Sequence, residues 1–253
     1  MTTRILVTRA SAQAGSLHVA LRDAGLEPVD VPAIAVETDP PGGQLDDAAA
    51  NLHWFAWAVV TSPNGARAIL SAAQRVLTEL GTPFWAAIGD ATATVLEREG
   101  IEVDFRPSRA DAHALAEEIP IAPGQEIVLL RGDLAGDELP KRLRQRGAIV
   151  TDVVTYRTIE GPASSRQVFR DVFAGGRPDA VLFASGSAAR GLVALAELEG
   201  LDVRSIPAIC IGPETQREAL RLGFRVLATS PDPGATSIAA TAAAALAQPM
   251  ETR

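Results

Sequence analysis

Four short segments of the chain place hydroxyl, amide and glycine residues directly after an apolar run. They are Thr61-Ser62-Pro63-Asn64-Gly65, Ile88-Gly89-Asp90-Ala91-Thr92, Ala184-Ser185-Gly186-Ser187 and Ile211-Gly212-Pro213-Glu214-Thr215. Serine is a preferred N-cap, proline suits the first helical position, and glycine lets a ligand approach the backbone. Each segment therefore predicts a helix N-terminus, where unpaired N–H groups and the helix dipole favour anionic groups. These residue types are also ordinary caps, and that alternative stays open for each segment.

Two arginines occupy comparable positions after apolar runs. Arg9 follows Ile5-Leu6-Val7-Thr8, and Arg131 follows Ile127-Val128-Leu129-Leu130. A guanidinium group binds a carboxylate through two parallel hydrogen bonds, so both arginines are candidates for binding an anionic ligand. A role in surface solubility is the alternative for each of them.

The composition excludes several classes of function. The chain has 253 residues, of which 47% are hydrophobic and 21% charged, and its formal net charge is -8. This charge argues against a nucleic acid as partner, and it requires that any anionic ligand be held by local groups. His18, His53 and His113 lack the spacing of a metal site, and the single Cys210 cannot form an internal disulfide. The Gly-x-Gly-x-x-Gly, Walker and Gly-x-Ser-x-Gly patterns are absent, so we expect no cofactor, no metal and no hydrolase triad.

Patterning along the chain bears on its location and on its surface. No apolar stretch reaches the roughly 18 residues of a membrane span, and the N-terminus has no signal-peptide pattern. We therefore expect a cytoplasmic protein with no membrane partner. A monomer is expected because no additional apolar helix face is evident. The carboxylate pairs Asp46-Asp47 and Glu117-Glu118 fall on predicted polar helix faces, where we expect them to be solvated.

Apolar runs and amphipathic segments alternate along the chain. Continuous apolar runs predict strands at residues 5–8, 57–61, 85–88, 127–130, 180–183 and 208–211. Leu17 and Leu21 define one helical face closed by Gly25, and Leu139 and Leu143 define another closed by Gly147. A last helix is expected from Thr236 to Ala247. This order predicts the α/β class with parallel sheets.

The chain also contains an internal repeat. An offset of 123 carries Ser62 to Ser185, Arg67 to Arg190 and Gly89 to Gly212, and an offset of 122 carries Arg9 to Arg131. One nearly constant offset over several elements indicates two copies of one α/β unit. The sequence therefore predicts two similar lobes.

Two extended segments suggest how the repeats form the lobes. Residues 29–38 and 150–163 each end in a linker rich in proline or glycine. If both cross between lobes as a two-stranded connection, residues 1–35 and 164–253 form one lobe and 38–155 the other. We then expect an active-site cleft between the lobes. A linear division near residue 122 is the alternative.

Six motifs in series resemble one known family. To the four segments above, the sequence adds Leu130-Arg131-Gly132 and Val154-Thr155-Tyr156, in the order and spacing of uroporphyrinogen-III synthases. The resemblance covers nearly the whole chain. It implies two α/β lobes and a cofactor-free lyase that cyclises hydroxymethylbilane to uroporphyrinogen III, with loss of water and inversion of ring D. The pathway implied is tetrapyrrole biosynthesis, which leads to haem, sirohaem and cobalamin.

The resemblance also implies a role for particular residues. Tyr156, the only tyrosine, is expected to donate a proton or hydrogen bond to the departing hydroxide, with packing of the phenol as the alternative. Thr92 and Thr215 are further catalytic candidates. The linear tetrapyrrole carries eight carboxylates, which the remaining candidates are expected to bind: Arg9, Ser62, Asn64, Gly89, Arg131, Gly132, Ser185, Gly186, Ser187 and Gly212.

A protein of another class remains the alternative. Repeated α/β lobes also occur in non-catalytic modules that bind or sense a small anion, and a fold does not determine a function. Asp90 and Glu214 place carboxylates at two of the proposed anion sites, which would weaken the synthase interpretation if they faced the ligand.

Overall fold

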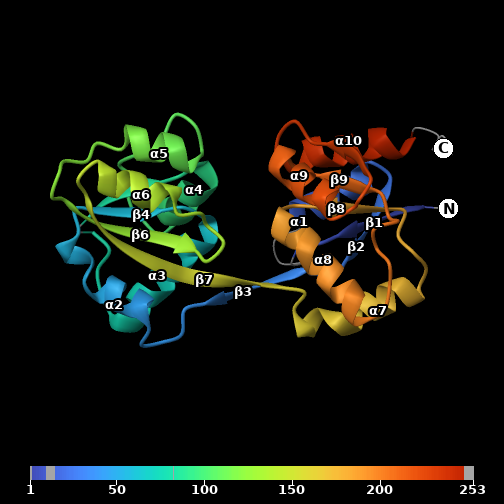
Figure 1. Ribbon diagram of the computed structural model, residues 1–253, viewed down its shortest axis with the longest axis horizontal. Helices are drawn as coiled ribbons and strands as arrows, with labels where there is room; N and C mark the ends of the chain where they lie inside the picture. The colour runs from blue at the N-terminus through green and yellow to red at the C-terminus, as the bar shows by residue number, and fades with distance from the viewer. Residues whose placement is uncertain (1, 10–14, 82, 248–253) are drawn as a thin grey trace. The chain divides into compact units, whose positions relative to one another are not determined.

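The computed structural model describes residues 2–9, 15–81 and 83–247. The chain has the expected α/β fold and divides into two compact units, Met1–Ala35 with Ile159–Arg253 and Val36–Thr158 (Figure 1). Each unit contains a five-stranded sheet. The sequence places the second lobe at residues 38–155, inside the second unit.

The first unit is a sheet covered by helices on both faces. The strand order is β10-β9-β8-β1-β2 and every pairing is parallel. The strands are β1 (Thr3–Val7), β2 (Leu26–Asp30), β8 (Ala180–Phe183), β9 (Ala208–Cys210) and β10 (Val226–Thr229). One core holds α1 (Gly15–Asp23) and α10 (Ala235–Ala247) against the sheet. A second core holds α7 (Arg166–Ala174), α8 (Gly186–Leu198) and α9 (Pro213–Arg221), and a short 3₁₀ turn (Ala163–Ser165) precedes α7.

The second unit repeats this layered arrangement. Its strand order is β3-β7-β6-β4-β5. The strands are β3 (Ile34–Thr38), β4 (Trp57–Val60), β5 (Phe84–Ala87), β6 (Glu126–Gly132) and β7 (Ile149–Glu160). One core joins the sheet to α2 (Gln44–Ala50), the 3₁₀ turn Leu52–Trp54, α3 (Pro63–Val76) and α4 (Asp90–Arg98). The other joins it to α5 (Ala112–Glu118) and α6 (Glu138–Gln145).

Burial explains why the apolar runs form the central strands. All four positions of β4 and of β8 are buried, as expected for strands covered on both faces. The helical faces are also confirmed, because Leu17 and Leu21 are buried in α1 and Leu139 and Leu143 in α6. Among the described residues, no helix combines the length and the apolar character that a membrane crossing demands.

Hydrogen bonds confirm the internal repeat at the level of geometry. The N–H of Ile88 donates to the carbonyl of Val60 at 3.1 Å, and the N–H of Ile211 donates to that of Phe183 at 3.0 Å. Both residues of the second bond lie 123 positions after those of the first. In each unit, the segment that follows one strand is thus tied to the carboxyl end of its neighbour.

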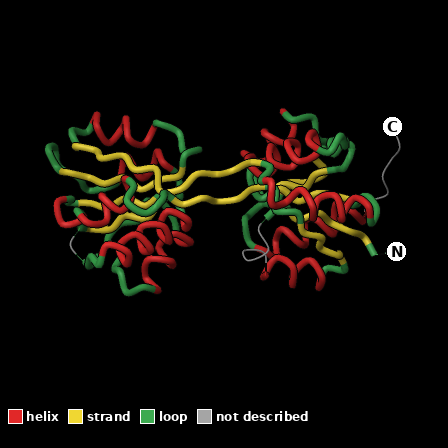
Figure 2. Tube along the Cα trace, turned by 90° about the horizontal axis from the view of Figure 1, so that it is seen from below, coloured by secondary structure: helices red, strands yellow, loops and turns green. Residues whose placement is uncertain are grey.

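The chain crosses between the units along β3 and β7, which are neighbours in one sheet (Figure 2). The N–H of Asp39 donates to Thr155 O at 3.1 Å, and the N–H of Gly161 donates to Ala33 O at 2.9 Å. The two strands therefore run antiparallel. The boundaries of the compact units fall within β3 and β7, so β1 pairs with β8 from the C-terminal part of the chain.

The expectation of solvated carboxylates is wrong for Asp46. Asp47, Glu117 and Glu118 are exposed, whereas Asp46 is buried in α2 and forms an ion pair with Arg75 of α3. Hydrogen bonding from Arg75 lowers the pKa of Asp46. Helical periodicity did not reveal this pair because the partner lies on another helix.

Candidate functional site

Tyr156 and Ser62 form the most specific polar contact among the sequence candidates. Ser62 follows β4 and is the N-cap of α3, where its Oγ accepts a hydrogen bond from the N–H of Gly65 at 3.0 Å. The Ser62 hydroxyl in turn donates to the phenol oxygen of Tyr156 on β7 at 3.1 Å. The predicted cap, with Pro63 at the first helical position, is thus confirmed, and it also holds the tyrosine.

A glycine provides the space for the phenol. A Cβ at Gly132 would lie 2.5 Å from Cζ of Tyr156 and 2.6 Å from its hydroxyl oxygen. These distances are shorter than any van der Waals contact, so only glycine at position 132 accommodates this tyrosine rotamer. The motifs Leu130-Arg131-Gly132 and Val154-Thr155-Tyr156 therefore meet in space.

A register shift between β6 and β7 directs the tyrosine to this place. Arg131 pairs with Val154 but Gly132 pairs with Tyr156, so Thr155 is the extra residue of a bulge. Bulges re-aim side chains beside functional sites. The Thr155 side chain is buried and its hydroxyl donates to Arg131 O at 3.1 Å, which fixes the backbone next to Tyr156.

This arrangement leaves a proton available at the phenol. A serine hydroxyl has one proton to donate, and Ser62 gives it to Tyr156 while its own oxygen accepts from Gly65. The phenol oxygen is therefore an acceptor within the protein, and no described residue accepts its proton. Tyr156 is only partly buried, so that proton is available for a bound ligand.

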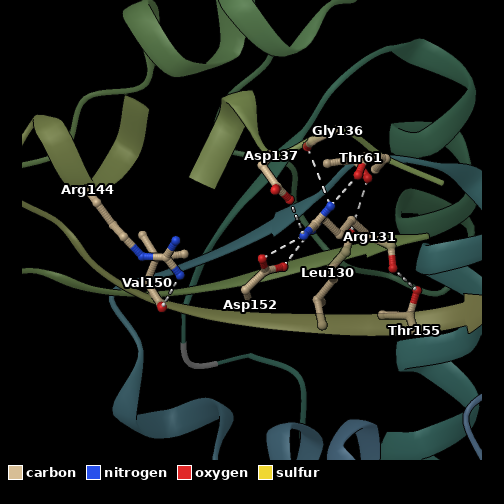
Figure 3. A network of polar contacts seen from close by, with 10 residues as sticks. Thr61, Leu130, Arg131, Gly136, Asp137, Arg144, Val150, Asp152 and Thr155 are labelled. Carbon is tan, nitrogen blue, oxygen red and sulfur yellow. Dashed lines mark hydrogen bonds and ion pairs between the residues drawn. The ribbon is translucent and has the colours of Figure 1, made fainter. Parts of the chain in front are cut away.

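Arg131 does not offer its guanidinium to a ligand, which differs from the sequence expectation (Figure 3). Its Nε donates to Asp152 at 2.6 Å, and Nη2 donates to Asp152 at 2.8 Å and to Asp137 at 3.3 Å. Nη1 donates to the carbonyls of Ala135 and Gly136. The hydrogen bonds that Arg131 donates to Asp152 raise the pKa of Arg131. With all three nitrogens engaged, Arg131 positions the loop after β6 instead of binding an anion.

Removing this arginine is expected to destabilise the second unit. The side chains of Arg131 and Asp152 are 11% and 21% exposed, so Arg131→Gln leaves a largely buried carboxylate without its partner. We expect the free energy of unfolding to fall by about 2 kcal/mol, somewhat less than for a fully buried pair. Arg144→Gln is the matched control because Arg144 is exposed and makes one bond, to Val150 O at 3.2 Å. Equal urea midpoints for the two variants would contradict this role.

Arg9, which corresponds to Arg131 in the repeat, has the opposite surroundings. It lies after β1 and is partly buried, and burial lowers the pKa of its guanidinium. Within the described part of the chain, no hydrogen-bond or ion-pair partner reaches it. A partly buried cation without a partner is stabilised by an anionic ligand. Arg9 therefore remains a candidate for binding an anion, as the sequence predicts.

Among its described residues, the first unit has no counterpart of the Ser62–Tyr156 pair. Ser185 caps α8 by accepting from the N–H of Ala188 at 3.1 Å, and its Oγ lies 2.9 Å from that of Ser187. A Cβ at Gly186 would lie 3.0 Å from Cγ of Glu218. Gly186 thus permits close packing of α8 on α9, while Ser185 and Ser187 bond to each other.

The two later junctions begin α4 and α9 with glycine caps. Gly89 and Gly212 are extended, and Thr92 and Thr215 lie buried in the first turns. Neither threonine hydroxyl bonds to another described residue, so both can serve a ligand. A Cβ at Gly212 would meet nothing within 4 Å, whereas one at Gly89 would lie 3.0 Å from Cβ of Ala110. Gly212 is therefore the junction with open space.

The two acidic residues at these junctions point into solvent. The side chain of Asp90 is 93% exposed and lies 3.3 Å from Arg106. That of Glu214 is 91% exposed and lies 3.7 Å from Arg217. Each carboxylate thus has a basic neighbour of its own.

Comparison with known proteins identifies the family. The family model described as uroporphyrinogen-III synthase HemD matches residues 15–240. The chain belongs to the uroporphyrinogen-III synthase family. This confirms the resemblance inferred from the six motifs.

Several curated proteins resemble this member of the uroporphyrinogen-III synthase family. The uroporphyrinogen-III synthase of Chlorobaculum parvum is 29% identical over 230 residues, which cover 88% of this chain and 90% of that protein. The porphyrin biosynthesis protein HemD of Ruminiclostridium josui is 28% identical over 88% of this chain but only 45% of its own length. The uroporphyrinogen-III synthase of Synechococcus elongatus is 31% identical over 61% of this chain and 60% of its own length. The matched region thus spans about half the length of the Ruminiclostridium josui protein and somewhat more of the Synechococcus elongatus protein.

Solved structures share the fold. A mutant uroporphyrinogen III synthase from Thermus thermophilus superposes with a TM-score of 0.67 at 19% identity, covering 96% of this chain and 98% of that one. The Helicobacter pylori uroporphyrinogen-III synthetase gives a TM-score of 0.65 at 16% identity, covering 96% and 99%. The two-lobed fold is therefore that of the uroporphyrinogen-III synthase family.

Sequence reasoning missed two residues that position this site. The Thr155 hydroxyl bonds to the backbone beside Tyr156, and the Asp152 carboxylate accepts a hydrogen bond from the Arg131 guanidinium. A charged residue within the apolar segment Ile149-Val150-Thr151-Asp152-Val153 was a usable signal, because a carboxylate in such a strand needs a partner. Oδ1 of Asn64 accepts a bond from Arg67 at 3.1 Å, and the binding of substrate by Asn64 stays a prediction.

Proposed function

We propose that the chain is a cofactor-free lyase that cyclises hydroxymethylbilane to uroporphyrinogen III, with loss of water and inversion of ring D. Membership of the family supports the reaction class. The observation that carries the proposal is the phenol of Tyr156, which Ser62 holds as an acceptor so that its own proton stays free.

In the proposed first step, the C–O bond of the hydroxymethyl group breaks. The departing hydroxide takes the Tyr156 proton and leaves as water, and the pyrrole, which keeps its N–H proton, becomes an electrophilic azafulvenium cation. Ring D attacks through its substituted carbon to give a spiro intermediate, which reopens and closes again with ring D inverted. Ring D finally loses the proton of its unsubstituted carbon, and this proton restores the phenol.

Positioning is proposed to contribute more than acid strength. Closure without inversion gives the type I isomer, so the protein must hold ring D in the geometry that leads to type III. The substrate carries eight carboxylates and the protein has a net charge of -8, so local donors must bind it. Candidates in the first unit are Arg9, Thr215 and the N–H groups after Gly212. Those in the second unit are Ser62, Tyr156, Thr92 and the N–H groups after Gly89.

A product assay tests the proposal. Purified protein is mixed with freshly generated hydroxymethylbilane, and the isomers are separated by chromatography. We expect type III product. Type I alone would overturn the synthase proposal and leave a non-catalytic anion-binding module.

Gly212→Val tests the proposed approach of a substrate carboxylate to the backbone. We expect KM to rise by about tenfold, because the side chain enters ligand space and costs roughly one hydrogen bond to a charged group. The thermal midpoint is expected to stay unchanged, since Gly212 is extended and a Cβ there meets nothing within 4 Å. Gly81→Val is the control, because that glycine also has open space but precedes β5. An unchanged KM in folded Gly212→Val would remove this junction from the site.

A further inference from the structure

Two arginines at equivalent positions of the repeat have different partners. Arg190 lies on α8 and binds two carboxylates, Glu160 at 2.7 Å and Glu218 at 2.9 Å. Bonds from Arg221 and Arg190 lower the pKa of Glu218 to about 2. The position that Arg190 occupies in the first unit is thus a carboxylate-binding position.

Arg67, 123 positions earlier on α3, binds no carboxylate. Within the part of the chain that the structure describes, its Nη1 donates one hydrogen bond to Oδ1 of Asn64, and it forms no ion pair. Val95 occupies the position that corresponds to Glu218. Thr38, which corresponds to Glu160 at the offset of 122 that relates β3 to β7, carries no charge. The acidic partners of the first unit are therefore missing here.

The bond to Asn64 places the Arg67 guanidinium near the N-terminus of α3, where the helix dipole disfavours a positive charge. Asn64 is the second residue of α3, so the bond folds Arg67 back toward the positive end of the helix dipole. Two protein carboxylates lie beside the guanidinium of Arg190 in the first unit. Arg67 is exposed, so an anion from outside the protein can reach its guanidinium.

We propose that Arg67 binds a carboxylate of the substrate, on the pyrrole ring that carries the departing hydroxymethyl group. Asn64 and Ser62 lie within one turn of α3, and Ser62 holds the phenol that protonates the leaving hydroxide. One helical turn, about 5.4 Å, matches the reach of a carboxymethyl or carboxyethyl arm on a single ring. This inference rests on the proposed function, and it makes Arg67 a binding residue that orients the reacting ring.

Arg9 and Arg131 differ in their partners in the same way as Arg67 and Arg190. In the pairs Arg9 with Arg131 and Arg67 with Arg190, protein carboxylates bind the second member and none binds the first within the described chain. Arg98 likewise has no carboxylate partner among the described residues, although its counterpart Arg221 binds Glu218. The feature that distinguishes Arg67 from Arg98 is its bond to Asn64, two residues after Ser62.

Kinetics of Arg67→Gln test the proposal. We expect KM for hydroxymethylbilane to rise by about tenfold with little change in kcat. This pattern is expected when the lost contact binds the substrate equally well in the ground state and in the transition state. Arg67→Lys is expected to recover part of the affinity, because the charge remains and the two-pronged geometry is lost. The KM of the wild type is expected to rise with salt more steeply than that of Arg67→Gln.

Arg98→Gln is the matched control. Arg98 is an exposed arginine of the same unit and lies at the end of α4 opposite to Gly89. Arg98→Gln changes the net charge by the same amount as Arg67→Gln. A KM of Arg67→Gln equal to that of Arg98→Gln, with wild-type protein producing type III isomer, would overturn this inference alone. Wild-type protein that forms no type III isomer would overturn the proposed function and this inference with it.

Discussion

Tyr156→Phe is expected to lower turnover by roughly 10- to 1000-fold, the range for loss of a general acid or one positioned donor. The phenyl ring keeps its place over Gly132, but the proton for the departing hydroxide is gone. The product that this variant forms enzymatically should still be the type III isomer, because isomer choice depends on how the substrate is folded and not on this proton. Turnover, isomer ratio and thermal midpoint are measured on one preparation.

Ser62→Ala separates proton donation from packing. This substitution removes the hydrogen bond between Ser62 and Tyr156 and also the N-cap of α3, at a cost of about 1 to 2 kcal/mol in stability. It leaves the phenol proton of Tyr156 in place. We expect its turnover to fall less than that of Tyr156→Phe although its midpoint falls more. Full turnover of Tyr156→Phe with a lowered midpoint would show that the tyrosine is structural.

Gly132→Ala is expected to reduce turnover by about 100-fold, the effect of displacing a catalytic group by about 1 Å. The new Cβ would lie 2.5 Å from Cζ of Tyr156, so the ring must move and lose its bond to Ser62. The free energy of unfolding should fall by about 1 kcal/mol for that bond.

Gly136→Ala provides the control for this substitution. Gly136 lies four residues later, in the loop after β6, and a Cβ there would meet nothing within 4 Å. We expect wild-type turnover for Gly136→Ala. The double variant Gly132→Ala with Tyr156→Phe should be about as slow as Tyr156→Phe alone, since both changes act on one group. Strictly multiplicative losses would show that Gly132 acts independently of Tyr156.

The layers and repeats of the fold were predictable because they depend on local patterns. Continuous apolar runs marked the strands buried on both faces, such as β4 and β8, and four-residue spacing marked the inner faces of α1 and α6. The offset of about 123 predicted two similar sheets, and in the structure the strands β9-β8-β1-β2 correspond in order to β5-β4-β6-β7. Serine followed by proline at residues 62 and 63 predicted the start of α3.

The partners of individual side chains were not predictable, because they depend on strand register. Arg131 was expected to face a ligand, yet its partner Asp152 lies on the adjacent strand β7, close to it only in the observed parallel register. The contact of Tyr156 with Gly132 depends on the bulge at Thr155, which no sequence pattern announced. Asp46 is buried for a similar reason, because Arg75 reaches it from another helix.

The isomer composition of the product, measured against protein concentration, tests the proposed function most directly. Spontaneous closure to type I competes with the catalysed path, so the type III fraction should rise with added protein and approach completion. At one fixed protein concentration, Tyr156→Phe should give a smaller type III fraction than the wild type. A type III fraction that does not depend on the amount of wild-type protein would contradict the proposal that this chain directs the closure.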